Sequence, residues 1–280
     1  MTNQNIDASN AFLQTQYDNA HHHLLVAGSL FDHDAFKSRL TWNAEYGYDL
    51  YRRELYKTTF IAAAGTGFRA PDASDRYGFG GTPNLAPERS QNLELGLRQR
   101  WGATQTWDLR AFRSRVRDLI SVDYDAANDA NGDFVNDTTG GPAFRAVNIG
   151  RTRNDGLEMT YRYADAQWNG TLTGLVQNPK DRSTDASLDR RARRSVTAQV
   201  RREIGRYYLS TDVLGSSDRS DFGGKDSGYT LWNLGAGVKL SQGFSLSARL
   251  ENLLDRDYQT AFAYRQAGRS AYATLRWEHR

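Results

Sequence analysis

Apolar and polar residues alternate along almost the whole chain with a period of two, the period of a β-strand whose faces meet different surroundings. In one such run, Leu93, Leu95 and Leu97 alternate with Asn92 and Glu94. The runs last about 10–13 residues, longer than the roughly 5–6 residues usual for strands of soluble proteins. That length suits a tilted strand that crosses a bilayer. The pattern therefore predicts an all-β chain of membrane-spanning strands.

Thirteen strands are expected, joined by connections that alternate between short and mostly long. All five prolines fall in the long connections, as expected because proline cannot donate to a strand ladder. Short turns on one side and long loops on the other are typical of transmembrane barrels. The predicted strands are 8–18, 22–33, 37–48, 56–67, 89–101, 104–122, 151–163, 167–177, 192–204, 206–216, 229–241, 244–254 and 269–279, and the prolines are Pro71, Pro83, Pro87, Pro142 and Pro179.

The predicted fold is an antiparallel transmembrane β-barrel with about 12–14 strands present. With thirteen strands the first and last run the same way and cannot pair antiparallel, so either the count is off by one or residues 1–280 belong to a larger barrel. The opening residues, MTNQNIDASNAF, lack the basic and apolar segments of a signal peptide. We expect a fragment, and we expect that it forms no stable monomeric pore alone.

Composition excludes several classes of protein. The chain has no Cys, so it has neither disulfides nor thiolate metal sites. Its net charge of +3, from 36 basic and 33 acidic residues, is too small to indicate nucleic acid. We interpret the densest basic run, from Arg190 to Arg194, as a solvated strand start beside lipid headgroups. Mean hydropathy is −0.72 and no window matches a membrane helix, but alternation hides a barrel from such averages.

Three ordered segments carry motifs. In the first, Gly-Phe-Arg-Ala-Pro ends at Pro71 and Asn-Leu-Ala-Pro-Glu follows it. The second runs from Asn148 to Glu158 and the third from Leu250 to Tyr258, with Leu254 where Phe is usual. Together they resemble TonB-dependent outer-membrane receptors, which implies the C-terminal thirteen strands of a 22-stranded barrel, with plug domain and signal peptide absent. The motif residues are Phe68, Arg69, Pro71, Asn84, Leu85, Pro87, Glu88, Asn252 and Tyr258.

Two of these regions are also similar to cobalamin (vitamin B12) receptors, through Tyr77 to Leu85 and through the spacing from Tyr258 to Arg269. The resemblance implies that external loops and plug capture cobalamin and that TonB acts on the plug, which this chain lacks. Ferric siderophore, haem or another large nutrient are alternative ligands, and a passive porin or a soluble β-sandwich binding module are alternative classes. Aromatic residues offer a flat contact for a corrin ring. The expected ligand-facing residues are Tyr77, Phe79, Phe134, Phe222, Tyr264 and Arg265.

Other candidate chemistry is weaker. His21 and His23 could share a metal, but we interpret the three consecutive histidines as solvated residues of a short turn. The segment from Asp129 to Asp133 suggests weak calcium binding in an external loop, although the EF-hand register fails. No cofactor is otherwise expected. Arg69 and Glu94 are expected to be inward-facing charges that contact water or a plug.

Two further observations concern the class of protein. The chain has no nucleophile elbow, Walker loop or dinucleotide fingerprint, so an enzyme is not expected; an outer-membrane hydrolase is the residual alternative. Trp277 stands three residues before the end, whereas barrels of the resembled family usually end on an aromatic residue. We expect the chain to lie in the cell outer membrane.

Overall fold

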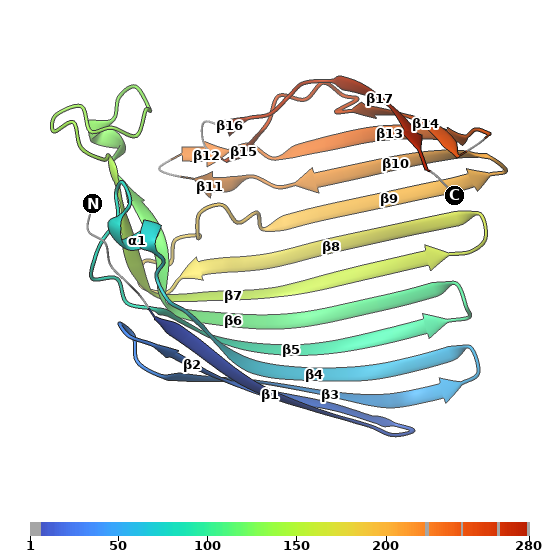
Figure 1. The fold of residues 1–280 in the computed structure, drawn as a ribbon, viewed down its shortest axis with the longest axis horizontal. Helices are drawn as coiled ribbons and strands as arrows, with labels where there is room; N and C mark the ends of the chain where they lie inside the picture. Colours follow the sequence, from blue (N-terminus) through green and yellow to red (C-terminus); the bar gives the residue numbers. More distant parts are fainter. Residues whose placement is uncertain (1–6, 222–223, 242, 262–263, 279–280) are drawn as a thin grey trace.

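One antiparallel sheet dominates the computed structural model, which describes residues 7–221, 224–241, 243–261 and 264–278 (Figure 1). Its thirteen strands are neighbours in chain order, and two short hairpins lie in the loops. The sheet strands are β1 (Ala8–Asp18), β2 (His22–His33), β3 (Arg39–Arg53), β4 (Tyr56–Arg69), β5 (Glu88–Trp101), β6 (Gln105–Tyr124), β7 (Phe144–Ala164), β8 (Trp168–Asp181), β9 (Arg194–Ile204), β10 (Tyr207–Ser216), β13 (Tyr229–Lys239), β14 (Phe244–Glu251) and β17 (Ser270–Trp277).

The loop elements are small. Helix α1 (Ala73–Tyr77) has Asp72 as its N-cap residue, and Asp72 forms a capping box with Asp75. A single 3-10 turn, η1 (Ala126–Asn128), lies in the loop between β6 and β7. The hairpin strands are β11 (Arg219–Asp221) with β12 (Gly224–Asp226), and β15 (Gln259–Ala261) with β16 (Tyr264–Arg265). No helix within the described ranges is both long and apolar enough to cross a membrane.

The thirteen predicted strands are confirmed, but three boundaries were wrong by at least four residues. Strand β3 continues to Arg53, β7 begins at Phe144 rather than 151, and β8 continues to Asp181. Pro179 therefore lies in a strand and not in a loop. The N–H that Pro179 lacks would point toward the β9 side of the strand, the side on which Gln177 N bonds the oxygen of Arg193. Strand β9 does not reach Pro179, since its first residue, Arg194, pairs with Val176. The strand consequently loses no ladder hydrogen bond.

Register places apolar residues opposite apolar residues across the sheet. One row runs through Tyr17, Leu24, Tyr46, Ala62 and Leu95, each paired with the next. The buried strand residues lie on the other, polar face. In a single-layer sheet, side chains become buried where curvature makes them converge, so the polar face is concave and the apolar face is convex. Buried polar-face residues include Asp49, Thr59, Ile61, Asp108 and Thr160.

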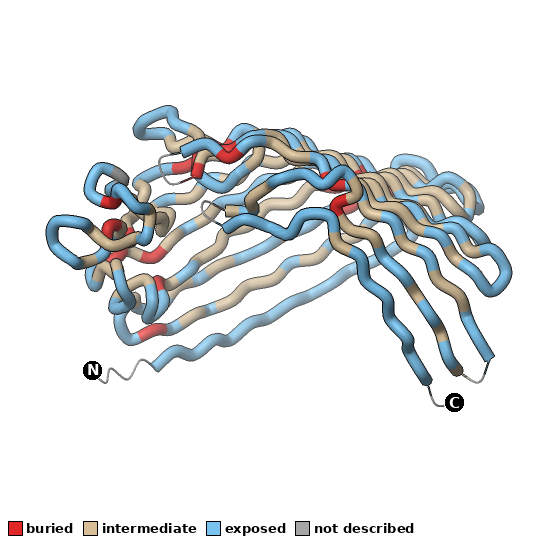
Figure 2. The backbone as a smooth tube through the Cα atoms, turned by 90° about the horizontal axis from the view of Figure 1, so that it is seen from above, coloured by how far each residue is buried: buried red, intermediate tan, exposed pale blue. Residues whose placement is uncertain are grey.

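The sheet is bent into an open trough with β1 along one border and β17 along the other (Figure 2). In the described part of the chain, β1 pairs with β2 alone and β17 with β14 alone. The sheet has an odd number of strands, so its two edge strands run in the same direction. Pairing between them could not be antiparallel, and the sheet stays open as the odd count predicts.

Candidate functional site

The loop from 70 to 87 is held against the wall by the first sequence motif. The Arg69 guanidinium lies 3.1 Å from Asp75 Oδ2 and 3.0 Å from Glu88 Oε1. The same Glu88 oxygen accepts a hydrogen bond of 2.9 Å from the backbone N–H of Ile120 on β6. Leu85, within this loop, is buried. The motif residues therefore act as a staple that fixes where the loop leaves β4 and returns on β5.

Asn148, from the second motif, joins that loop to β7. Its Nδ2 donates to the carbonyl oxygens of Ala86 (2.9 Å) and Asp118 (2.7 Å), and its Oδ1 accepts from Ala86 N at 2.8 Å. Gly80 contributes a close approach: its φ is +76°, and a Cβ there would lie 2.6 Å from the Phe144 ring. A side chain at position 80 would thus be both strained and obstructed. This backbone requirement sets the path of the loop.

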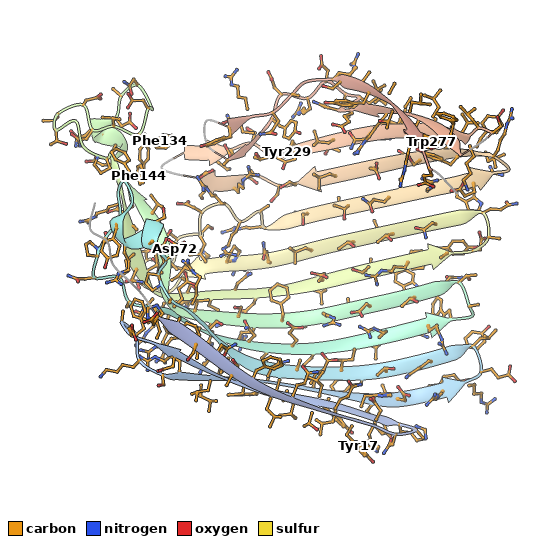
Figure 3. All side chains as sticks on the ribbon, in the orientation of Figure 1. Tyr17, Asp72, Phe134, Phe144, Tyr229 and Trp277 are labelled. Carbon is orange, nitrogen blue, oxygen red and sulfur yellow. The ribbon has the colours of Figure 1, made fainter. Side chains whose placement is uncertain are left out.

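An aromatic cluster forms where the two longest outer segments meet. Phe144 packs edge-on against Phe79 at 5.7 Å and against Phe134 at 6.1 Å between ring centroids. Figure 3 shows Phe134 and Phe144 close together at the loop end of the sheet. Phe134 also contacts the Tyr124 ring at 5.8 Å. Two of the predicted ligand-facing residues are thus brought together by Phe144, which the sequence prediction missed. Phe144 was missed because the predicted strand began at residue 151. Gly140, Gly141 and Pro142, just before Phe144, indicated a loop and not the start of a strand.

The remaining predicted ligand residues are more dispersed. Tyr77 ends α1 and receives the Arg76 guanidinium 4.9 Å from its ring. Tyr264 and Arg265 form β16, and both are exposed. Within the described residues, no ring contact joins Tyr264 to Phe79 or Phe134. Phe222 lies outside the described residues. Two exposed aromatic sites, on the α1 loop and on β16, therefore line the loop end of the trough.

The third motif shapes the last outer loop through Asn252. This residue is buried and has a φ of +49°. Its Oδ1 accepts from Arg256 N at 2.8 Å, its Nδ2 donates to Arg256 O at 2.9 Å, and its own N–H donates to Asn233 Oδ1 at 2.9 Å. Asparagine tolerates this left-handed conformation better than most residues do. Tyr258 then packs on Tyr229 at 4.9 Å between ring centroids.

Buried charges connect three outer loops. Asp221 is 1% exposed and lies 2.8 Å from Arg190 Nε. Arg219 pairs with Asp226 at 3.0 Å and donates to the carbonyl of Gln259. Burial, with the Asp221 charge nearby, raises the pKa of Asp189.

This arrangement corrects the interpretation of the basic run as a strand start. Strand β9 begins only at Arg194, and Arg190 belongs to a loop where it neutralises a buried carboxylate. The basic run therefore has a structural partner in the next outer loop. The run of arginines did not indicate that Asp221 is the partner of Arg190, because Asp221 lies 31 positions farther along the chain.

The expected calcium loop uses its carboxylate internally. Asp129 Oδ2 accepts from Phe134 N (2.9 Å) and Tyr124 Oη (2.7 Å), and its Oδ1 accepts from Asp133 N (3.0 Å). Burial opposes ionisation of Asp129, but these hydrogen bonds outweigh it and lower its pKa. The chain as described has no group of three or more His, Asp or Glu side chains placed to hold a metal. Weak calcium binding by this loop stays a prediction.

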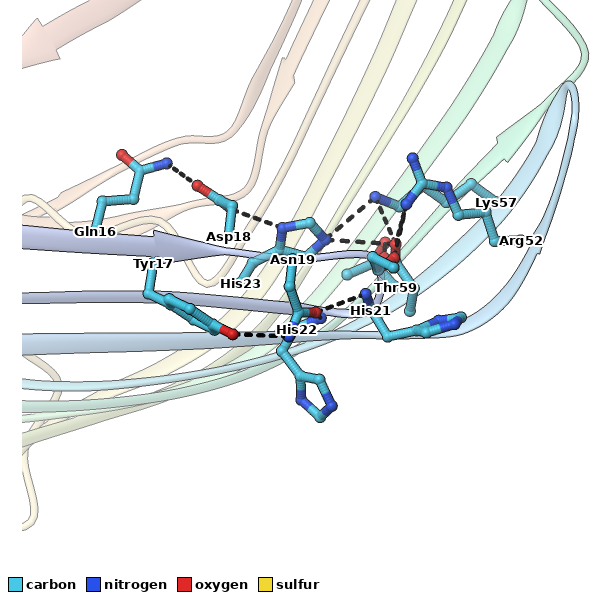
Figure 4. Close-up of polar contacts among 12 residues, drawn as sticks. Gln16, Tyr17, Asp18, Asn19, His21, His22, His23, Arg52, Lys57 and Thr59 are labelled. Atoms are coloured by element: carbon cyan, nitrogen blue, oxygen red, sulfur yellow. Dashed lines mark hydrogen bonds and ion pairs between the residues drawn. The ribbon is translucent and has the colours of Figure 1, made fainter.

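The histidines form part of a polar network at the short-turn end of the sheet (Figure 4). His23 Nδ1 lies 2.7 Å from Asp18 and its Nε2 lies 3.4 Å from Asp49, whose carboxylate also receives Lys57 at 2.9 Å. The interpretation of all three as solvated turn residues was wrong for His23. His22 bonds Tyr46 Oη at 2.7 Å. Sequence could not show these cross-strand carboxylates.

The concave face contains a polar hollow of about 500 Å³ beneath β9, β10, β13, β14 and β17. Arg201 lies over the Tyr208 ring at 3.6 Å from its centroid. Farther along the same face, Glu94 pairs with Arg110 at 3.3 Å, which places Glu94 on the inner side as expected. The hollow is lined by Arg201, Tyr208, Ser210, Asp212, Arg249, Glu251, Tyr272 and Thr274 among others. This face presents charges and hydroxyls to whatever the trough encloses.

An antiparallel sheet with an apolar convex face, a polar concave face and loops gathered at one end is the wall of a transmembrane β-barrel. Residues 1–253 match the family model described as "TonB dependent receptor-like, beta-barrel". The chain therefore belongs to the TonB-dependent receptor β-barrel family. This membership places the chain in the outer membrane, in a family of receptors and not of enzymes.

Individual relatives agree with this assignment. The chain is 31% identical over 253 residues to the vitamin B12 transporter BtuB of Vibrio vulnificus (strain YJ016), covering 88% of this chain and 38% of that protein. Copper transporter OprC matches in structure with a TM-score of 0.78 at 16% identity, over 96% of this chain and 47% of that chain. The siderophore receptor PirA from Acinetobacter baumannii gives 0.75 at 16% identity, over 96% and 45%. The chain thus spans less than half the length of these relatives, and the two structures show the fold alone.

Proposed function

We propose that this chain is part of a TonB-dependent receptor that transports cobalamin across the outer membrane, supplying barrel wall and external ligand-binding loops. The observation that carries the proposal is the 31% identity to a vitamin B12 transporter, over 88% of this chain. The structural likeness to copper and siderophore receptors supports the fold and leaves the ligand to be tested.

The mouth has the chemistry that a large, rigid ring system requires. Phe79 is 61% exposed and is braced from below by Phe144. Tyr77 is exposed on the same loop as Phe79, and Tyr264 is exposed on the last outer loop, between β14 and β17. Aromatic side chains provide large contact area at low entropic cost because they have only two side-chain torsions. Phe79, Tyr77, Phe134, Tyr264 and Arg265 are the residues proposed to contact the ligand, together with Phe222.

The rest of the receptor would complete what this sheet begins. We place the plug, through which TonB would act, and the remaining wall in a part of the receptor beyond these residues. The complement must contain an odd number of strands, because its two ends pair antiparallel with β1 and β17, which run in the same direction. A 22-stranded barrel fulfils this condition. We expect the 280 residues alone to bind cobalamin poorly.

Titration of the purified complete receptor with cyanocobalamin tests the proposal. Tight, saturable binding is expected, and Phe79→Ala should weaken it roughly tenfold, because loss of one aromatic contact costs about 1.4 kcal/mol. Phe60→Ala is the matched control, since Phe60 lies on the convex face away from the mouth. Binding of a ferric siderophore, haem or Cu²⁺ with no binding of cyanocobalamin would refute the assigned ligand. Ion conductance without energised TonB would refute active transport in favour of a porin.

A further inference from the structure

A dense group of cations interrupts the apolar convex face near the loop end of the sheet. On β6 that face carries Trp107, Leu109 and Ala111, and then, with the same spacing of two, three arginines. Strands β5, β7 and β8 extend these three positions into rows. We call the group the basic patch; it consists of Arg89, Arg113, Arg115, Arg117, Arg151, Arg153 and Lys180.

Strand pairing places like charges directly opposite one another. Arg117 is the register partner of Arg89 on one side and of Arg151 on the other. Arg115 faces Arg153, which in turn faces Lys180. Side chains in such positions have Cβ atoms about 4.5–5.5 Å apart, and like charges there destabilise the sheet. The folded wall therefore contains a repulsion that a bound anion would relieve.

Among the described residues, neutralisation inside the protein reaches only part of the basic patch. Asp155 bonds Arg113 at 2.7 Å and also pairs with Arg153, and Lys180 pairs with Asp185 at 3.6 Å. Asp155 is the acidic member of these rows, so the two rows farther from the band keep an excess of positive charge. This gradient follows the expected change from hydrocarbon, where charges need partners, to headgroups, which can supply them.

The outer arginines are available to a ligand. Arg89, Arg115, Arg117 and Arg151 are all exposed, and in the described part of the chain none of them forms an ion pair. The Nε of Arg153 is buried without a hydrogen-bond partner. Guanidinium groups with unused donors match the oxygens of phosphate, which they bind in a bidentate manner.

The position of the basic patch in the membrane indicates which ligand it meets. The convex face contacts lipid, and the loop end faces the outside, so the basic patch lies at the headgroup level of the outer leaflet. Residues two apart on a strand are separated by about 6.8 Å, so three rows and four strands cover roughly 14 Å in each direction. We propose that the basic patch binds the phosphate groups of a lipid headgroup in the outer leaflet. The site is independent of the nutrient that the receptor transports.

The test uses the receptor expressed from its complete reading frame and purified in a zwitterionic detergent. Its thermal unfolding is measured with and without micelles containing lipid A that carries two phosphates. The test variant is Arg117→Gln with Arg151→Gln. The control variant is Arg202→Gln with Arg206→Gln, which removes two exposed arginines at the opposite, short-turn end of the wall.

The wild-type receptor and the control variant should be stabilised by lipid A. The test variant should bind it roughly thirtyfold more weakly, the equivalent of about 1 kcal/mol for each arginine. Without lipid, the test variant should unfold at the same temperature as wild type or higher, because a repulsion has been removed. Equal lipid stabilisation of both variants would overturn the proposal. Equal stabilisation by dephosphorylated lipid A, or by inorganic phosphate alone, would overturn it as well.

Discussion

Removal of the Asn148 side chain should release the outer loop 70–87 from the wall. The side chain makes three hydrogen bonds with backbone groups, two to Ala86 and one to Asp118. Asn148→Ala leaves one N–H and two carbonyl groups without those partners. Each such bond contributes about 1 kcal/mol when its groups are partly buried, so the docked loop, which is held by the two bonds to Ala86, loses about 2 kcal/mol.

Hydrogen exchange followed by mass spectrometry measures this change directly. A loss of about 2 kcal/mol corresponds to roughly thirtyfold faster opening of the Ala86 amide, because each 1.4 kcal/mol is tenfold. Asn148→Asp should give an intermediate result: it keeps an acceptor for Ala86 N–H but places a carboxylate against two carbonyl oxygens. Peptides that contain Ala86 report the effect.

Asn154→Ala is the matched control. Asn154 lies on the same strand and the same face, but it bonds the Gln177 side chain on β8 and not the loop. Its removal should leave exchange at Ala86 unchanged. If Asn148→Ala also leaves that exchange unchanged, Asn148 does not hold the loop, and the staple formed by Arg69 and Glu88 must suffice alone.

Three further perturbations test other parts of the mouth. Phe144→Ala removes the ring that supports Phe79 and Phe134, so ligand affinity in a titration should fall roughly tenfold; an unaltered affinity would exclude the bracing role. Asp129 has a lowered pKa in the folded loop, so its ionised form stabilises residues 125–143 fully above about pH 3.9, and this stabilisation is lost as the pH falls through the lower pKa of the folded state. An acid-active protease should therefore cleave residues 125–143 slowly at about pH 5 and faster below that window. The Asp129→Asn variant should abolish this pH dependence. Asp221→Ala removes the buried carboxylate that pairs with Arg190, so trypsin should cut after Arg190 sooner. Resistance equal to wild type would contradict a role of Asp221 in joining the loops.

The sequence alone predicted the strands because one local rule governs each of them. Every strand presents one face to lipid and one to water, so alternation with a period of two is required along its full length. The register partners Leu24 and Tyr46, or Leu97 and Leu109, continue the same apolar face from strand to strand. Even the basic patch follows the period, because its arginines replace apolar residues at alternate positions.

Tertiary structure decided what depends on partners distant in sequence. Pro179 could stay in a strand only because its neighbour β9 starts later. Arg190 finds Asp221 and His23 finds Asp49 across strands or loops, with no signal in the local pattern. Phe144 acquires its role where three separate segments converge. Hydrophobic alternation is a local consequence of two solvents, whereas loop packing depends on contacts that exist only after the sheet has curved.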